Sequence, residues 1–166
     1  MRDGRRRALL ALGAGLCGSG IAGCDFQLRR SPPLPFARIA LIGFAARSPL
    51  QQELRQQLAT QVQVIDNPAQ ADVVLRALAD TRQKTVVAST SASQVREVQL
   101  RVRLQFRILT GGGRELAPEA ELMLVRDLSY NETQALAKEQ EEAQILRDIQ
   151  SDIVQQVLRR LAAVKL

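Results

Sequence analysis

Apolar and polar residues alternate strictly from Val98 to Ile108, within the stretch from Val95 to Leu109. The even-numbered residues from 98 to 108 are all apolar, whereas the odd-numbered residues from 99 to 107 are arginine or glutamine. A period of two is typical of a β-strand with one buried face. The glycines at 111–113 then predict a turn, and the alternation resumes from Leu116 to Leu128. The sequence therefore predicts a long β-hairpin with a basic face toward water.

The register of this hairpin can be predicted because a slip of one residue would exchange the two faces of a strand. We centre the turn on Gly112, which keeps apolar residues opposite apolar residues. Pro118 cannot donate a main-chain hydrogen bond, so it predicts an edge strand or a bulge near the turn. The expected opposite pairs are Leu100 with Leu124, Val102 with Leu122, Phe106 with Pro118, Arg103 with Glu121, and Gln105 with Glu119.

Two stretches have the three- and four-residue spacing of helices. In the first, Ser48 is a predicted N-cap, with Pro49 at the first helical position and Gln51 placed for a capping box. The apolar stripe of that helix is Leu50, Leu54 and Leu58. The second begins at Asn131 as N-cap and has no glycine or proline up to Leu166. Its predicted core-facing residues are Leu146, Ile149, Ile153, Val157, Leu161 and Val164.

Further strands are predicted between the two helices and before the first. Residues 37–44 form a mostly apolar first strand, and residues 61–65 a short one. Residues 71–79 are apolar on both faces, which favours a central strand, and residues 85–90 continue it or pair with it. The predicted fold is α+β: a two-layer sandwich with two helices packed on one face of a mainly antiparallel sheet of about four strands.

The N-terminus has the three parts of a secretory signal in order. Residues 1–7 are basic, residues 8–23 are small and apolar, and the run ends in Ile21-Ala22-Gly23-Cys24. This ending resembles the lipobox of bacterial lipoproteins, which implies that Cys24 is acylated and becomes the first residue of the mature chain. The predicted organisation is a signal peptide over 1–23 that is removed, a lipidated tether over 24–36, and a single α+β domain over 37–166.

The composition disfavours several functional classes. The chain has no histidine and no tryptophan, and its net charge is +6. Removal of residues 1–23, with four arginines and one aspartate, leaves 19 basic and 16 acidic residues, or +3. A nucleic-acid binder would usually be more basic and richer in aromatic residues. No catalytic constellation, metal-ligand cluster or phosphate-binding loop is present in the sequence, so we expect no enzyme, no cofactor and no metal.

Three segments carry a resemblance to a known family. Residues 24–29, the helix at 48–58 and above all residues 126–142 are similar to the lipopolysaccharide-assembly lipoproteins LptE. The resemblance implies a lipoprotein that is anchored by its acyl chains to the periplasmic side of the outer membrane. It also implies a 1:1 plug in the lumen of the β-barrel LptD, a role in assembling that barrel, and binding of lipopolysaccharide during its insertion into the outer leaflet.

The same resemblance selects two candidate ligand-binding residues. Lys138 matches the family's lysine in Ala-Leu-Ala-Lys, and Arg96 is the basic residue nearest to the loop that holds the family's ligand-contacting arginine. The alternative for Lys138 is an ordinary helix lysine that pairs with Glu141 or Glu142. The stripe of Arg101, Arg103 and Arg107 is better explained as a solvated face balanced by Glu119 and Glu121 than as a phosphate site.

One residue favours a different location. Asp25 follows the lipidated cysteine where the family usually has glycine, and aspartate there resembles the inner-membrane retention signal of enterobacteria. The alternative function is therefore a lipid-anchored periplasmic auxiliary subunit of an inner-membrane ABC transporter. A co-purifying β-barrel or a co-purifying ATP-binding-cassette complex would separate the two hypotheses.

Overall fold

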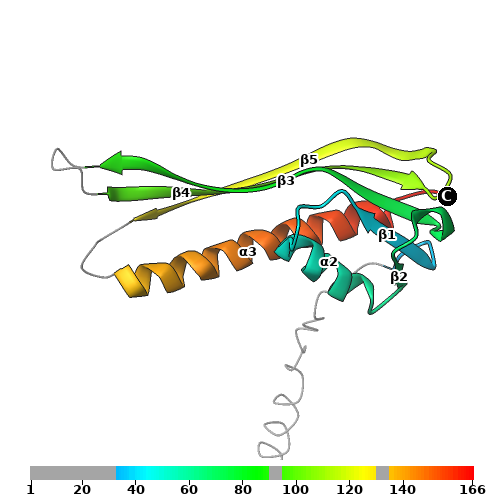
Figure 1. Cartoon of the computed structure of the whole chain (residues 1–166), viewed down its shortest axis with the longest axis horizontal. Helices are drawn as coiled ribbons and strands as arrows, with labels where there is room; N and C mark the ends of the chain where they lie inside the picture. The colour runs from blue at the N-terminus through cyan, green and yellow to red at the C-terminus, as the bar shows by residue number, and fades with distance from the viewer. Residues whose placement is uncertain (1–32, 90–94, 130–134) are drawn as a thin grey trace, which may run out of the picture. The chain divides into compact units, whose positions relative to one another are not determined.

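The computed structural model describes residues 33–89, 95–129 and 135–166 (Figure 1). Within these residues, five strands form one sheet in the order β2-β1-β3-β4-β5. The strands are β1 (Arg38–Ile42), β2 (Gln63–Ile65), β3 (Val73–Ser89), β4 (Val95–Thr110) and β5 (Glu115–Ser129). The helices are α2 (Pro49–Leu58), the short 3-10 helix η1 (Pro68–Gln70) and α3 (Ala135–Ala162).

The sheet is mixed, which differs from the predicted sheet of about four mainly antiparallel strands. β1 is parallel to β2 on one side and to β3 on the other, whereas β3, β4 and β5 are antiparallel neighbours. The sequence pattern did not indicate the parallel part because β1 and β2 are only five and three residues long. The α+β class and the two long helices are as predicted.

The predicted hairpin is present, but its register is shifted by two residues over most of its length. Leu104 stands opposite Leu122 and Val102 opposite Leu124, rather than Val102 opposite Leu122. Two register shifts lie between Phe106 and Leu109, where β5 contributes extra residues around Pro118. A shift by two keeps every side chain on its expected face. β5 is an edge strand with bulges near the turn, as the position of Pro118 predicts.

A bulge in β3 changes which side chains face the helices. The register moves from Ala77 opposite Phe106 to Ala79 opposite Gln105, so Leu78 is an extra residue. Residues directly opposite each other in an antiparallel pair lie on the same face. Beyond Leu78, the side chains of β3 on the helix side are therefore those paired with Leu104, Val102 and Leu100, namely Asp80, Arg82 and Lys84.

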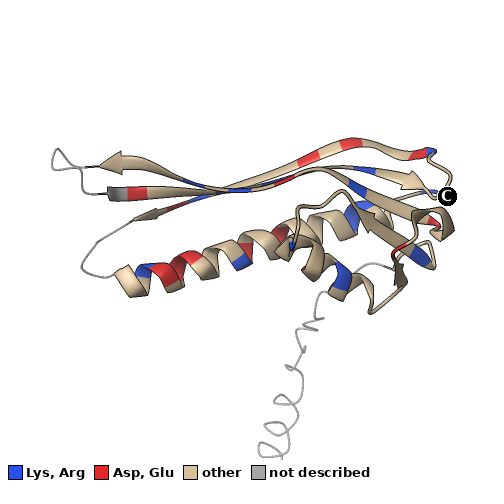
Figure 2. Cartoon of the chain, in the orientation of Figure 1, with Lys and Arg blue, Asp and Glu red and all other residues tan. Residues whose placement is uncertain are grey.

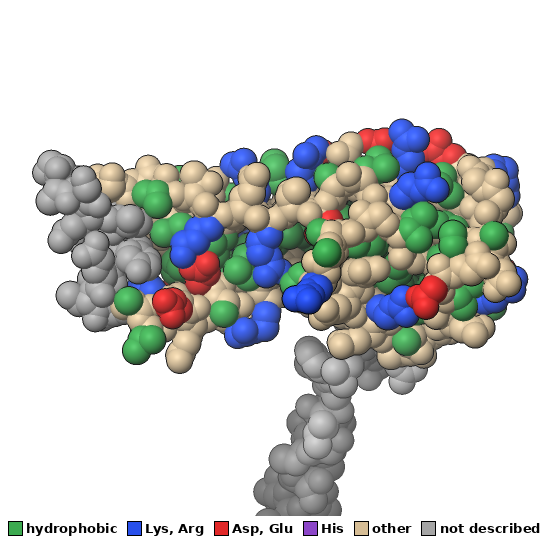
Figure 3. Space-filling view, in the orientation of Figure 1, with side chains coloured by type: hydrophobic (Ala, Val, Ile, Leu, Met, Phe, Trp, Pro, Cys, Tyr) green, Lys and Arg blue, Asp and Glu red, His purple; other side chains and the backbone are tan. Residues whose placement is uncertain are grey.

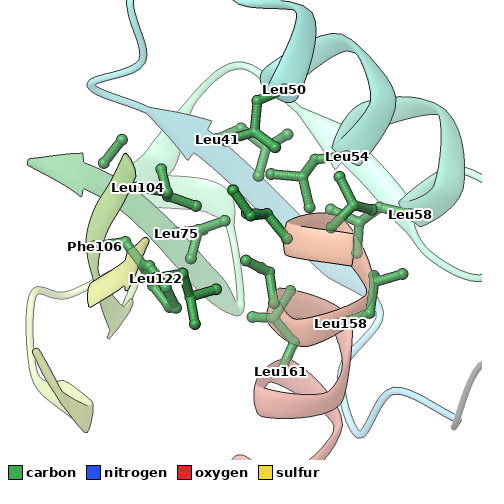
Figure 4. Close-up of a cluster of buried hydrophobic side chains, with 14 of the residues drawn as sticks. Leu41, Leu50, Leu54, Leu58, Leu75, Leu104, Phe106, Leu122, Leu158 and Leu161 are labelled. Atoms are coloured by element: carbon green, nitrogen blue, oxygen red, sulfur yellow. The ribbon is translucent and has the colours of Figure 1, made fainter. Parts of the chain in front are cut away.

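The main hydrophobic core lies between the sheet and the two helices (Figure 4). Leu54, Leu58 and Leu75 are fully buried in it, and Phe106 is 1% exposed. All three leucines of the predicted α2 stripe are buried, and so are five of the six residues predicted for the stripe of the last helix, although α3 ends at Ala162, before Val164. The sixth, Leu146, is partly buried, while Val154 and Leu158 broaden the stripe beyond the prediction.

The start of α2 follows the sequence prediction in part. The Ser48 hydroxyl accepts a hydrogen bond from the Gln51 main-chain N–H at 3.1 Å, as an N-cap should. The Gln51 side chain does not complete the predicted capping box, because its amide donates to the Leu41 carbonyl at 3.5 Å. This bond ties the first turn of α2 to β1. The predicted cap of α3 at Asn131, and Cys24 with the residues around it, lie outside the described residues.

Candidate ligand-binding site at the tip of the long strands

The ends of the three long strands meet the start of α3. Glu97 of β4 stands opposite Ser129 of β5, and Val95 stands opposite Ser89 of β3. We call this region the sheet tip, defined by residues 84–89, 95–100 and 126–129. In Figure 1 the sheet tip lies at one end of the long strands, and α3 runs along the face of the sheet that α2 also covers.

Lys138 reaches from the second turn of α3 toward the sheet tip. Its ammonium nitrogen lies 2.8 Å from the Glu141 carboxylate and 3.4 Å from the Ser129 hydroxyl of β5. The predicted alternative of an i,i+3 pair with Glu141 is therefore present. The side chain is only 14% exposed, which is more covered than a solvated helix lysine would be.

Arg96 is the second residue of β4, and its position in the strand places it in the sheet tip. It precedes Glu97, which is opposite Ser129, the residue whose hydroxyl Lys138 contacts. The structure thus brings the main-chain positions of both candidates to the same end of the domain. The 90–94 segment, where the family's arginine would fall, lies outside the described residues.

Side chains of the strands form ion pairs and hydrogen bonds with α3 near the sheet tip. Lys84 pairs with Glu142 at 2.6 Å, and the Arg82 guanidinium donates to the Gln150 side chain at 2.9 Å. Arg126 lies 3.8 Å from the Asp152 carboxylate. Sequence reasoning missed Arg82 and Lys84 because the bulge at Leu78 reverses the alternation in β3.

Apolar surface accompanies these charges. Val98 and Leu128 are buried at 1% and 2% exposure, whereas Val86 is 52% and Leu136 is 79% exposed. Figure 3 shows hydrophobic side chains interleaved with lysine and arginine side chains where the strands and α3 meet. Figure 2 shows acidic residues in the early turns of α3. A surface that combines cations with exposed aliphatic groups suits an anionic amphiphile.

The basic stripe on the opposite face of the sheet is largely neutralised. Arg103 pairs with Glu121 at 2.8 Å and Arg107 with Glu119 at 2.7 Å, as the prediction of a balanced face requires. The hydrogen bond from Arg103 lowers the pKa of Glu121, and the bond from Arg107 lowers the pKa of Glu119. The Arg101 guanidinium donates to the Gln99 side chain at 2.9 Å.

Within residues 33–89, 95–129 and 135–166, no group of three or more acidic, cysteine or histidine side chains is arranged to hold a metal ion. None of the helices in these ranges has the length and apolar character needed to cross a membrane.

Similar solved structures define the class of the fold. The solution NMR structure of uncharacterized lipoprotein B from Nitrosomonas europaea matches with a TM-score of 0.69 and 30% identity, over 83% of this chain and 90% of that one. A minor lipoprotein from Acinetobacter baumannii matches with a TM-score of 0.61 and 27% identity, over 79% of this chain and 94% of that one. Both are lipoproteins, so this α+β domain is of a kind found in bacterial lipoproteins.

The family follows from a match over residues 36–161 to the lipopolysaccharide-assembly family LptE. The LPS-assembly lipoprotein LptE of Yersinia enterocolitica is 28% identical over 163 residues, which cover 96% of this chain and 78% of that protein. The chain belongs to the LptE family of lipopolysaccharide-assembly lipoproteins.

Proposed function

We propose that this protein is an outer-membrane lipoprotein that plugs the β-barrel LptD as a 1:1 partner, helps it to assemble, and binds lipopolysaccharide on its way to the outer leaflet. The observation that carries the proposal is the family match, which spans both helices and all five strands of the domain. The lipobox that ends in Cys24 supports an acylated anchor. The role is one of binding and scaffolding, without catalysis.

Lys138 and Arg96 are the proposed lipopolysaccharide contacts, and the surroundings of Lys138 support its part. A lysine that is 14% exposed and held by Glu141 and Ser129 offers a positioned ammonium at the sheet tip. The ammonium can donate three hydrogen bonds, of which Glu141 and Ser129 accept two, so a phosphate of lipopolysaccharide can accept the third. Such binding should weaken as salt increases.

Co-purification tests the partner. Affinity-tagged protein should be isolated from its own membranes with a large β-barrel in equal amount. Isolation with an ATP-binding-cassette complex would instead support the alternative of an auxiliary subunit at the inner membrane, which Asp25 favours. Replacement of Asp25 by glycine, followed by separation of inner and outer membranes, shows whether that residue affects sorting.

Binding of purified lipopolysaccharide tests the site. Lys138→Asp reverses the charge beside Glu141 and should weaken binding about tenfold, the size of one charged hydrogen bond. Lys165→Asp makes the same charge change at the exposed C-terminal end and should leave binding unchanged. Equal binding by both variants at low salt would contradict the role of Lys138. Loss of the barrel with intact lipopolysaccharide binding would place Lys138 in the plug interface instead.

A further inference from the structure

We propose that a cavity between the bulged end of β5 and the C-terminal end of α3 binds a single acyl chain with an anionic head group, as in a fatty acid. The cavity lies beside Ala163, whereas Lys138 lies near the other end of α3. The proposal therefore does not rest on the lipopolysaccharide contact or on the barrel partner proposed above.

The bulges of β5 account for the presence of the cavity. Both register shifts of the β4–β5 ladder fall between Phe106 and Leu109, and Pro118 has no N–H to restore the pairing. Bulges bend a strand and increase its local twist. The bend falls where the last turn of α3 crosses the strands, and a cavity of about 250 Å³ lies between them.

The walls of the cavity are mainly apolar. Phe106 and Ile108, which are 1% and 2% exposed, line it together with Val164 of the C-terminal segment. Leu116 and Ala117 of the neighbouring strand β5 also line it, with Ala117 paired directly with Ile108 in the sheet. Pockets for whole drug-sized ligands measure roughly 300–1,000 Å³. The smaller volume here suits part of one unbranched acyl chain better than a complete lipid.

Arg160 gives the cavity its preference for an anion. Its guanidinium carbon lies 5.9 Å from the centre of the Phe106 ring, so the charge is held at the wall of the cavity. Among the described residues, no carboxylate lies within ion-pair distance of Arg160. Glu119 also lines the cavity, but its carboxylate is already bonded to Arg107 at 2.7 Å and to the Gln105 amide.

These two properties select the ligand class. The apolar walls bury methylene groups, and each buried CH₂ contributes roughly 0.8 kcal/mol to a transfer from water. The guanidinium presents several N–H donors in a fixed plane, which matches a carboxylate or a phosphate. A neutral chain would leave these donors without an anionic partner, so an acidic amphiphile is preferred.

Photolabelling of the full-length protein in phosphatidylcholine vesicles tests the proposal. The probe is dodecanoate with a diazirine near its methyl end, and the labelled residues are located by mass spectrometry. We expect labels on residues 116–120 and 163–164. Ala163→Trp fills the cavity mouth from an exposed position beyond α3, so the variant should fold and lose these labels. Unlabelled dodecanoate or dodecyl phosphate should compete, and dodecanol should compete weakly.

Two neighbouring arginines give a matched control for the charge. Arg160→Gln should reduce labelling about tenfold at a limiting probe concentration, the size of one charged hydrogen bond. Arg159→Gln removes the same charge from the same turn of α3 but does not line the cavity, so its labelling should equal that of the wild type. Labels spread evenly over the domain, unchanged labelling in Ala163→Trp or Arg160→Gln, or equal competition by dodecanol would each overturn the proposal.

Discussion

The guanidinium of Arg103 lies 2.8 Å from the carboxylate of Glu121, although the residue directly opposite Arg103 in the sheet is Met123. The pair is diagonal, because Glu121 stands opposite Gln105. Long side chains can span the distance between diagonal positions of adjacent strands. The ion pair therefore forms in spite of the two-residue shift that the bulges around Pro118 introduce.

Glu121→Gln should leave the free energy of unfolding nearly unchanged, because Glu121 and Arg103 are both substantially exposed and water screens their attraction. Denaturant unfolding followed by circular dichroism measures this change. A loss of several kcal/mol would mean that the pair is far better shielded from water than its exposure indicates.

Leu122→Asp should unfold the domain or cost several kcal/mol, because Leu122 is 6% exposed and belongs to the main core. The control is the next residue: Met123 is 53% exposed on the other face, so Met123→Asp should cost less than about 1 kcal/mol. The same unfolding measurement compares the two variants. If they are equally stable, the assignment of the two faces of β5 is wrong.

The faces of the hairpin could be predicted from the sequence, but its register could not. Alternation in β4 fixes which side chains are buried, and a shift of two residues leaves that pattern unchanged. The size of the shift depends on how β5 bulges around Pro118, which the alternation does not encode. In β3, the extra residue Leu78 reverses the alternation inside a run that is apolar on both faces. The pattern there predicts a strand, but it does not predict which side chains face the helices.

Gly43→Ala should destabilise the domain by more than Gly113→Ala. Both glycines have positive φ, at 78° and 90°, where an alanine costs roughly 1–2 kcal/mol. A Cβ on Gly43 would also overlap the main-chain carbonyl of Ala77 in β3, whereas a Cβ on Gly113 would meet nothing within 4 Å. The difference in melting temperature between the variants measures the cost of this close approach. Equal melting temperatures would mean that the loop after β1 can move away from β3 freely.

The pH dependence of stability should include a contribution from Asp72. Its carboxylate accepts hydrogen bonds from the Arg38 side chain at 2.7 Å and from the main-chain N–H groups of Arg38 and Ala37. The bond from the Arg38 guanidinium is the main cause that lowers the pKa of Asp72. A carboxyl with a lowered pKa in the folded state stabilises the fold above its unfolded pKa of about 3.9. This stabilisation is lost as the pH falls through the folded pKa.

Asp72→Asn should therefore be less stable than the wild type at pH 7, by about 1 kcal/mol or less, and the difference should shrink below about pH 4. Unfolding midpoints measured from pH 7 down to pH 2 test this prediction. Asp66→Asn controls for the change in net charge and for the loss of an exposed ion pair, because Asp66 pairs with Arg55 at 2.6 Å while its side chain is 88% exposed. A stability difference that grows toward low pH would contradict the assigned sign.

Of the candidate site, the sequence offered a pair of Lys138 with Glu141 or Glu142 as the alternative to a ligand contact. The structure has the pair with Glu141, but the surroundings of the lysine were not predicted. Spacing along one helix is enough to predict an i,i+3 pair. The contact with Ser129 and the low exposure of the lysine depend on how α3 lies against the end of β5, which no local pattern encodes. Lys84 was missed for a related reason, since its face depends on the bulge at Leu78.

The first half of α3 should open locally more easily than its second half, and salt should increase this opening. The second half is anchored by buried residues from Ile149 to Leu161, whereas the turns before Ile149 have the partly buried Ile145 and Leu146 together with charged contacts such as the Lys84–Glu142 pair. Removing Lys84 leaves Glu142, which is 20% exposed, with its charge unpaired.

Lys84→Met should therefore speed hydrogen exchange at amides 139–147, while the free energy of global unfolding changes by only about 1 kcal/mol. Moderate salt should speed exchange of the same amides in the wild type and have less effect in Lys84→Met, since screening weakens an attraction that the variant has already lost. The neighbouring exposed residue Gln83 provides the control, because Gln83→Met changes the other face of β3 and should leave these amides unaffected. Exchange in the first half of α3 that is as slow as at Ile153, and insensitive to Lys84→Met, would show that charged contacts are not what holds this half of the helix.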